Sequence, residues 1–459
     1  MGKLFFKLGV VSLVIKDVFG VIYAPHKTFK RIAANPKYLA IAIIVILFIS
    51  LQTTYYYSYY SKVHYEQTVP PLDQLSAFTA PAITDTVLDS LFPPLVAKPW
   101  TTPQGASITI NDDDYIEQNF YGNNSLQFIL YNGNSLSATL EQFGYTANCD
   151  PEGFTSLNLS LKPGSPDAAL PTAGTLTLYT ANGTSNYFTR DITSMLTNNY
   201  NEWNNLTIPV GTPEWQTTGT PNWSEITGLQ LTLTYSEPSH IHILLQGIFF
   251  RGQYLTQVNA FGTGSFLGFV TYSIGMQIIF QWLILAAIAY IIFKCYKATN
   301  VVWRSLFIVM GFTLMVLVVI AAIALLSSLT LQTVYYPYDF PPYGVLVYPD
   351  AVVNGASPAS QIAYESIVAT TNTYTTLTTV INIFMYVLQA AIVTFAVKAV
   401  SGLPPIKKPD FLDTETSKEE ETNTVTVQEF SYTKSLIVAI STVVLSAVIM
   451  AFLAVIGLF

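Results

Sequence analysis

Five long apolar stretches constrain the fold of this chain more than any other feature. They are Tyr38–Thr54, Phe266–Phe293, Val301–Leu329, Thr376–Val400 and Ser435–Phe459. A helix needs about 20 mostly apolar residues to cross the roughly 30 Å hydrocarbon core of a bilayer, because each residue adds about 1.5 Å. None of the five contains a charged residue or histidine away from its ends. We therefore predict a bundle of five membrane-spanning helices.

The composition supports a membrane protein and excludes several other classes. Of the 459 residues, 51% are hydrophobic and only 10% are charged, whereas soluble domains have about 25% charged residues. The net charge of −8 and the lack of a basic block argue against a nucleic-acid partner. The two cysteines, Cys149 and Cys295, are too few for a disulfide framework or a metal cluster.

The distribution of Lys and Arg predicts the side of the membrane on which each segment lies, because basic residues stay in cytoplasmic loops. Fifteen of the twenty fall in residues 1–37, in the loop between the second and third spans, and in residues 398–434. We therefore expect a plasma-membrane protein with a cytoplasmic N-terminus and an extracellular C-terminus. Residues 55–99 form an extracellular collar in this scheme, residues 330–375 an extracellular loop, and residues 401–434 a disordered cytoplasmic loop.

Five N-x-Ser/Thr sequons provide an independent sign of the same sidedness. Their asparagines are Asn123, Asn158, Asn182, Asn205 and Asn222. All five lie in the segment that the basic residues place outside the cell. The pattern predicts a surface glycoprotein.

The residues before the first span suggest an amphipathic helix. Apolar residues recur there at helical spacing, at Leu8, Val11, Ile15, Val18 and Ile22. The helix either lies on the inner leaflet or packs against the bundle.

Residues 21–47 also resemble the opening of the Yip-domain family of five-span membrane proteins. The resemblance rests on Pro25, Phe29, Lys30 and Arg31, followed by Asn35-Pro36 at the start of the span. It implies five spans and a cytoplasmic N-terminus. The family's eukaryotic members are associated with small GTPases and vesicle traffic. This chain departs from the compact family pattern by placing about two hundred residues between the first two spans.

Residues 100–255 have the pattern of an antiparallel β-sandwich. Short alternating or apolar runs are separated by Gly, Pro, Asn and Asp, as expected for strands joined by turns. The predicted strands are Ser107–Ile110, Ser125–Leu130, Thr175–Tyr179, Leu229–Thr234 and Ile241–Leu245. The fold class is thus a five-helix α bundle plus an extracellular all-β sandwich.

The end of this segment resembles the closing strands of galactose-binding-like jelly rolls, a fold found in many carbohydrate-binding modules. The resemblance rests on residues 203–209, 221–229 and 247–252. It implies a possible glycan ligand, which Trp203, Trp215 and Trp223 would stack against. The alternative is that these tryptophans pack in the core of the sandwich.

Two groups of polar residues are candidate metal ligands. Asp112, Asp113 and Asp114, with Glu117, offer oxygen ligands for Ca²⁺, although a solvated turn is the simpler interpretation. His240 and His242 face the same side of a strand but lack a third ligand nearby in the sequence. We expect no cofactor beyond N-linked glycans, with Ca²⁺ as the alternative.

Polar residues inside the predicted spans are amides rather than charges. Gln277 and Gln281 lie four residues apart in the second span, and Asn382 and Gln389 lie seven apart in the fourth. Each pair therefore occupies one helix face and is expected to hydrogen-bond across helices. Without an intramembrane charge, a coupled ion transporter has no candidate residue.

No catalytic motif stands out in the sequence, so we predict a protein that is not an enzyme. In one hypothesis it is a cell-surface protein whose sandwich binds the envelope or another protein, while the bundle anchors it or joins a complex. In the other it is a membrane-organising or transport-accessory protein in which the bundle is the functional part. The expected partners are membrane lipids, membrane or envelope proteins and possibly glycans, but not nucleic acid. The outer segment has 5 basic and 17 acidic residues, a net charge of 5 − 17 = −12 at pH 7. In strong acid its carboxylates would be neutralised, leaving a small positive charge. This composition suits an acidic exterior, so we hypothesise an acidophilic archaeal host.

Overall fold

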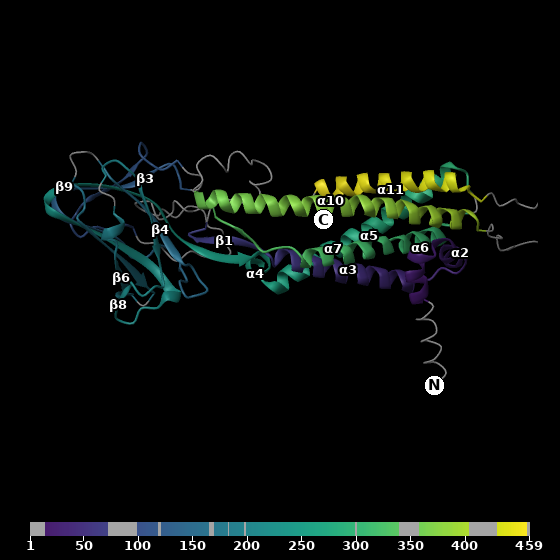
Figure 1. The fold of residues 1–459 in the computed structure, drawn as a ribbon, viewed down its shortest axis with the longest axis horizontal. Coiled ribbons are helices and arrows are strands. Elements are labelled where there is room, and N and C mark those ends of the chain that lie inside the picture. Colours follow the sequence, from purple (N-terminus) through teal and green to yellow (C-terminus); the bar gives the residue numbers. More distant parts are fainter. Residues whose placement is uncertain are drawn as a thin grey trace, which may run out of the picture. The chain divides into compact units, whose positions relative to one another are not determined.

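The chain folds into two compact units, one helical and one β-sheet (Figure 1). The computed structural model describes residues 14–71, 99–117, 121–164, 169–181, 183–196, 199–298, 301–338, 358–403 and 429–456. The helical unit comprises Met1–Val63, Thr256–Val334 and Ser366–Phe459. The sheet unit comprises His64–Leu255 and Tyr335–Glu365.

All five predicted spans form helices that are long and apolar enough to cross a membrane. They are α3 (Tyr38–Tyr60), α5 (Thr263–Cys295), α6 with α7 (Trp303–Thr313 and Met315–Leu329), α10 (Pro358–Ser401) and α11 (Tyr432–Val455). The predicted boundaries were too short for α3, which continues through Tyr60, and for α10, which begins well before Thr376. A short helix, α4 (Gln257–Phe261), precedes α5.

The third span is interrupted at Leu314, which the sequence does not signal. The backbone N–H of Leu314 bonds to the carbonyl of Gly311, and that of Leu317 bonds to the carbonyl of Leu314. Thr313 donates its hydroxyl to the carbonyl of Met310 at 2.6 Å. These three-residue hydrogen bonds tighten the turn locally, so that one apolar stretch contains two helices.

The N-terminal region packs against the bundle, which was one of the two expectations. Residues 14–23 are helical, and α2 (Pro25–Ala34) follows with Pro25 in its first turn. Of the predicted stripe, Val18 is buried and Ile22 packs against the core, whereas Ile15 is 45% exposed; Leu8 and Val11 lie outside the described residues. The residues that belong to the bundle core are Val14, Val18, Val21 and Phe29. Val14, Val18 and Val21 are also spaced four and three residues apart, so they too lie on one face of a helix.

A buried carboxylate joins this region together. Asp17 is 4% exposed and accepts a hydrogen bond from Arg31 Nε at 2.7 Å. The Nζ atom of Lys37 lies 3.7 Å from the second oxygen of Asp17. The basic residues of α2 and of the start of α3 are therefore tied to the preceding helix.

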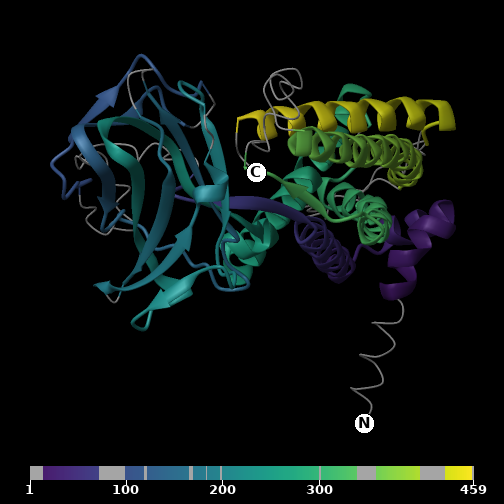
Figure 2. The same cartoon turned by 60° about the vertical axis from the view of Figure 1, so that its left-hand side comes forward.

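The sheet unit is an antiparallel sandwich built around two long strands, β3 (Ser125–Leu140) and β9 (Ile226–Thr256). β3 pairs with β9 along most of its length, with register shifts around Gly133. The first half of β9 also pairs with β5 (Ala173–Thr180), and its second half pairs with β4 (Ser156–Pro163). The pair β3–β9 thus belongs to both layers, which Figure 2 shows from the side.

The remaining strands extend the two layers. β6 (Gly183–Asp191) and β8 (Gln216–Thr218) continue outward from β5. β2 (Ser107–Asn111) pairs with β3, and β7 (Asn204–Pro209) pairs with β4. All five predicted strands are confirmed, and the last two are parts of the single strand β9. The core between the layers includes Phe128, Phe143, Leu178, Leu231 and Phe250.

The sheet also extends beyond the predicted segment 100–255. β1 (Val63–Val69), from the predicted collar, lies beside β9, and β10 (Val334–Tyr336), from the predicted loop 330–375, lies beside β1. The Glu66 side chain, 1% exposed, accepts bonds from Arg251 Nε at 2.9 Å and Arg251 Nη2 at 3.1 Å. It also accepts bonds from the backbone N–H groups of Gly252 and Tyr338, at 2.9 and 3.0 Å. One carboxylate therefore fixes three segments distant in sequence.

Candidate functional site

A polar cavity of about 370 Å³ lies between the helices of the bundle. It is lined by residues of α3, α5, α7, α10 and α11. The predicted amides Gln277, Gln281, Asn382 and Gln389 all line it, and Gln52 of α3 adds a fifth. The expectation that each pair occupies one helix face is therefore consistent with this arrangement. The structure gives none of these side chains a hydrogen-bond partner among the residues it describes, so bonding of the four predicted amides across helices stays a prediction.

Tyrosines of α3 and α10 meet along one part of the cavity wall. Tyr55 and Tyr374 line the cavity and are in contact through their hydroxyl groups. The ring of Tyr374 also stacks on Tyr59, with 4.8 Å between ring centroids. The tyrosines thus link α3 to α10, while Gln389, 2% exposed, lies about four helical turns further along α10.

A second cavity, of about 460 Å³, lies in the sandwich. Its residues come from the 141–145 segment, the β5–β6 hairpin and the start of β9. Tyr145 and Tyr179 contribute aromatic rings, Glu141 contributes a carboxylate, and Thr180 and Thr184 contribute hydroxyls. We call this cavity the hairpin cleft. Aromatic rings beside hydroxyl and amide groups suit a neutral polar ligand, including a sugar.

Hydrogen bonding fixes one wall of the hairpin cleft. Tyr179 is 8% exposed and donates its hydroxyl to Gln230 Oε1 at 3.2 Å. Gln230 Nε2 in turn donates to Thr139 Oγ1 at 2.8 Å. Burial raises the pKa of Tyr179, and the charge of Glu141 raises it further. The tyrosine therefore stays a neutral hydrogen-bonding group at physiological pH.

The predicted glycosylation sites lie on the surface of the sandwich wherever the structure describes them. Asn123, Asn205 and Asn222 are exposed, and Asn158 is half-buried. Asn222 Oδ1 accepts a hydrogen bond from the backbone N–H of Ser224 at the start of the short helix η3 (Trp223–Glu225). Asn182 lies outside the described residues.

Two of these sequons interlock on neighbouring strands. Asn158 of β4 lies opposite Thr207 of β7, and Ser160 lies opposite Asn205. Thr207 donates its hydroxyl to Asn158 Oδ1 at 3.3 Å, and Ser160 donates to Asn205 Oδ1 at 2.8 Å. Each hydroxyl of one sequon thus holds the amide oxygen of the other. The amide nitrogens, to which glycans attach, have no hydrogen-bond partner among the described residues.

The structure does not bring the three tryptophans into one binding platform. Trp215 is 6% exposed and donates its indole N–H to the carbonyl of Pro209 at 2.8 Å. Trp223 stacks on Phe188, with 3.7 Å between ring centroids, and its edge meets Trp215. These contacts favour the packing role for both residues. Trp203 is half-buried, with Lys162 Nζ 5.9 Å from its ring.

The acidic run Asp112–Asp114 forms a turn and offers no support for calcium binding. Asn111 Oδ1 accepts hydrogen bonds from the backbone N–H groups of Asp113 and Asp114, at 3.0 and 2.8 Å. The Asp114 carboxylate is paired with Lys162, at 2.6 Å. Among the described residues, no three His, Cys, Asp or Glu side chains are grouped so that they could hold a metal ion.

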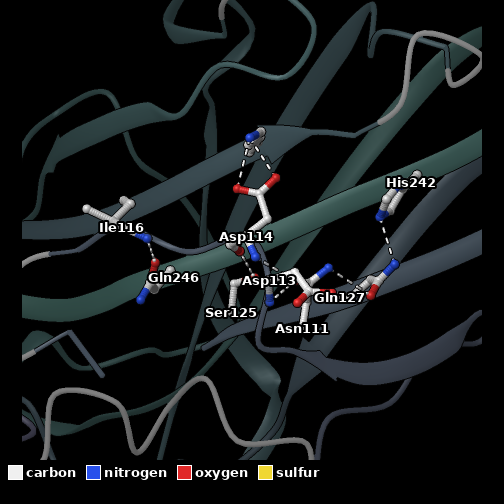
Figure 3. Close-up of polar contacts among 9 residues, drawn as sticks. Asn111, Asp113, Asp114, Ile116, Ser125, Gln127, His242 and Gln246 are labelled. Atoms are coloured by element: carbon white, nitrogen blue, oxygen red, sulfur yellow. Dashed lines mark hydrogen bonds and ion pairs between the residues drawn. The ribbon is translucent and has the colours of Figure 1, made fainter. Parts of the chain in front are cut away.

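The same turn begins a hydrogen-bonded chain that ends at His242 (Figure 3). Because Asn111 Oδ1 accepts from the backbone, its Nδ2 must be the donor to Gln127 Oε1, at 3.3 Å. Gln127 Nε2 then donates to His242 Nε2, at 2.8 Å. The ring nitrogen of His242 is thus an acceptor, which requires the neutral form with its proton on Nδ1. Burial lowers the pKa of His242, nearby His240 lowers it further, and Asp114 opposes the shift.

His240 has a different environment and does not join His242 in a site. Its ring stacks on Tyr131, with 4.7 Å between centroids. Its Nε2 atom is buried without a hydrogen-bond partner among the described residues.

Comparison with known proteins gives similarities to solved structures only. No protein-family model matches the chain, and no curated protein has significant similarity to it. Among solved structures, the chain is similar to an arabinose-bound α-L-arabinofuranosidase, at 16% identity and a TM-score of 0.26 over 39% of this chain. It is also similar to the family 11 carbohydrate-binding module of a Clostridium thermocellum cellulase, at 11% identity and a TM-score of 0.23 over 37% of this chain.

The extent of these matches differs between the two proteins. The match covers 95% of the carbohydrate-binding module but only 26% of the arabinofuranosidase. A β-1,2-glucanase from Parabacteroides distasonis matches at 12% identity and a TM-score of 0.25, over 33% of this chain and 22% of its own. The description of the sheet unit as a sandwich rests on the strand pairing given above.

Sequence reasoning missed two sets of residues. The hairpin cleft joins Glu141, Tyr145 and Tyr179 from segments that only the sheet topology brings together, so no local pattern marks them. In the bundle, Gln52 and Tyr55 lie at the end of the first predicted span, where they read as membrane-interface residues. The one available signal was that Gln52 is the sole amide of that span.

Proposed function

We propose that this chain is a non-enzymatic, N-glycosylated cell-surface membrane protein. Its five helices span the membrane, and its sandwich lies outside the cell, where it binds an envelope component or another protein. The observation that carries the proposal is the separation of two signals along the chain. All five sequons lie in the sheet unit, whereas basic residues cluster at the helix ends that the chain does not connect to that unit.

The helix ends show this separation in detail. One set of helix ends carries the basic side chains. They are Lys37 before α3, residues 294–304 between α5 and α6, Lys398 at the end of α10 and Lys434 at the start of α11. The opposite ends, at Tyr60, Thr263, Leu329 and Ile367, lead into the sheet unit or leave it. The positive-inside rule then assigns the sheet unit to the exterior.

Labelling of intact cells tests this orientation. Cys295 is exposed at the end of α5 and would lie inside the cell, while Thr217→Cys places a thiol on an exposed position of β8. We expect a membrane-impermeant maleimide to label Thr217→Cys on intact cells and to label Cys295 only after lysis. Labelling of Cys295 before lysis, with Thr217→Cys protected, would reverse the orientation. Glycopeptide mass spectrometry on protein from the native membrane tests the sequons separately.

The hairpin cleft is the part of the sandwich best suited to binding a partner. It combines aromatic rings, hydroxyls and one carboxylate in a cavity of the size found for small ligands. Cross-linking in native membranes, followed by mass spectrometry, should place envelope or protein contacts beside this cleft. Tyr145→Ala should reduce these cross-links, whereas Tyr200→Ala, at an exposed tyrosine outside the cleft, should not. Equal loss in both variants would contradict a role of the cleft.

A second candidate function assigns the activity to the bundle, as in a membrane-organising or transport-accessory protein of the Yip-like kind. The polar cavity favours this candidate, because an anchor does not need five unpartnered amides between its helices. The same cross-linking experiment separates the two. Stoichiometric partners linked to the bundle support the second function, and partners linked to the sandwich support the first.

A further inference from the structure

The amides of the bundle cavity need hydrogen-bond partners that the protein does not supply. Buried polar groups in proteins are nearly always hydrogen-bonded, and in hydrocarbon an unsatisfied amide costs several kcal/mol. Gln389 is 2% exposed and lines the cavity, yet it has no partner among the described residues. Gln52 and Gln281, which are half-buried, and Gln277 and Asn382, which are exposed, also have no partner among the described residues. Something other than the chain must complete these bonds.

The lining restricts the chemistry of that occupant. No residue lining the cavity is charged, so a charged ligand would lose its hydration without gaining a counter-charge. Each amide offers both donors and acceptors, and Tyr55, Tyr374, Thr378 and Ser446 add hydroxyls. Groups that both donate and accept match a set of ligand hydroxyls. The cavity therefore suits a neutral polyol.

The size of the cavity agrees with this chemistry. At about 30 Å³ for each water-sized group, a volume of about 370 Å³ has room for roughly a dozen non-hydrogen atoms. That is about the size of one hexose ring with its hydroxyls. The volume also falls within the range of small-molecule pockets.

Part of the cavity lining is exposed, on stretches of α5 and α10 that lie inside the predicted spans. Gln277 of α5 and Asn382 of α10 are exposed, and so is Leu377, whereas Ser446 of α11 is buried. Between these positions the lining is apolar, with Ile381, Met385 and Met450. Helix surface exposed at this level of a membrane bundle faces lipid rather than water. The ligand thus reaches the cavity from the bilayer, and the apolar lining suits its hydrocarbon chain.

We infer that the cavity binds a neutral membrane lipid through a hydroxyl-rich headgroup, such as a sugar. Amides and hydroxyls of the lining hold the headgroup, and the apolar lining of α10 and α11 holds the start of the chain. This site is distinct from the hairpin cleft; it rests on the proposed membrane-spanning bundle but not on the binding role proposed for the sandwich.

Native mass spectrometry of the full chain in nanodiscs tests this inference. The nanodiscs contain phosphatidylcholine with either a minor amount of a monogalactosyl diacylglycerol or the same amount of a phosphatidylglycerol. We expect one galactolipid to remain bound to each chain and no retention of the anionic lipid. Gln281→Leu combined with Gln389→Leu should lower retention by about tenfold or more, because several hydrogen bonds to the headgroup are lost. Thr394→Val, a polar-to-apolar change on α10 outside the lining, is the matched control.

A second pair of variants acts through volume instead of hydrogen bonding. Ala447 lines the cavity, whereas Ala451, one turn further along α11, is exposed and does not line it. Ala447→Phe should abolish retention, and Ala451→Phe should leave it unchanged. Equal retention in Ala447→Phe and the wild type would overturn the site, as would a preference for the anionic lipid. If no lipid is retained by the wild type, or if free galactose is retained as well as the galactolipid, the assignment of a lipid is overturned.

Discussion

Removing the charge of Glu66 should destabilise the sandwich by several kcal/mol. The Glu66 carboxylate is 1% exposed and accepts four hydrogen bonds, two from the Arg251 guanidinium and two from backbone N–H groups. In Glu66→Gln, one oxygen becomes an NH₂ group that faces these donors. Loss of one partner of a buried ion pair costs about 3–5 kcal/mol.

The cost converts into a measurable shift of melting temperature. For a unit of this size, each kcal/mol lowers the midpoint by roughly 2–4 °C, so we expect a fall of about 6–20 °C. Intrinsic fluorescence is a suitable assay, because four of the six tryptophans, Trp100, Trp203, Trp215 and Trp223, belong to the sheet unit. The control is Glu237→Gln, at an exposed position of β9, for which a change within about 0.5 kcal/mol is expected. If the two variants melt together, Glu66 does not hold β1, β9 and the segment after β10 in place.

Three further predictions concern pH, glycosylation and backbone packing in the sandwich. The pKa of His242 in the folded protein lies below its ordinary value of about 6.5, so the unfolded chain binds the proton first as the pH falls. The stability contributed by neutral His242 is therefore complete above about pH 6.5 and is lost as the pH falls through the folded pKa. His242→Gln should make the melting temperature depend less on pH over this window. Thr207→Val should remove the glycan of Asn205 from the intact mass and cost about 0.5–1.5 kcal/mol through the lost bond to Asn158. Gly228→Ala places a carbon 2.1 Å from the carbonyl oxygen of Glu141, so β9 must shift at the hairpin cleft, and thermal unfolding should show a loss of about 1–3 kcal/mol.

The helices were more predictable than their arrangement. Long apolar runs predict helices able to span a membrane, because a helix satisfies the hydrogen bonds of its own backbone in lipid. The end of α3 was placed too early, since the polar residues Gln52 to Tyr60 read as interface although they remain helical. The break at Leu314 depends on local turn geometry that no Gly or Pro at that position signals. Likewise, periodicity places Asn382 and Gln389 on one face of α10, but it does not predict which helix that face contacts.

The sandwich was predictable strand by strand but not as a topology. Alternation along Thr175–Tyr179 and Leu229–Thr234 identified strands, yet nothing in those runs shows that Leu229 and Ile241 belong to one continuous strand. Pro238 between them suggested a turn, but β9 continues past it where its partner β3 shifts register. The recruitment of β1 and β10 depends on the Glu66–Arg251 pair, whose members are 185 residues apart.

The position of β9 has a mechanical consequence. This strand belongs to both layers and ends at Thr256, directly before α4 and the α5 span. A force applied to the sandwich by a bound partner would therefore reach the membrane through a strand that is bonded along both edges, to β3 on one side and to β4 and β5 on the other. Such a load shears many ladder hydrogen bonds at once instead of peeling them one by one. β9 is thus one of the chain connections between the two units, and it has strand partners along both edges.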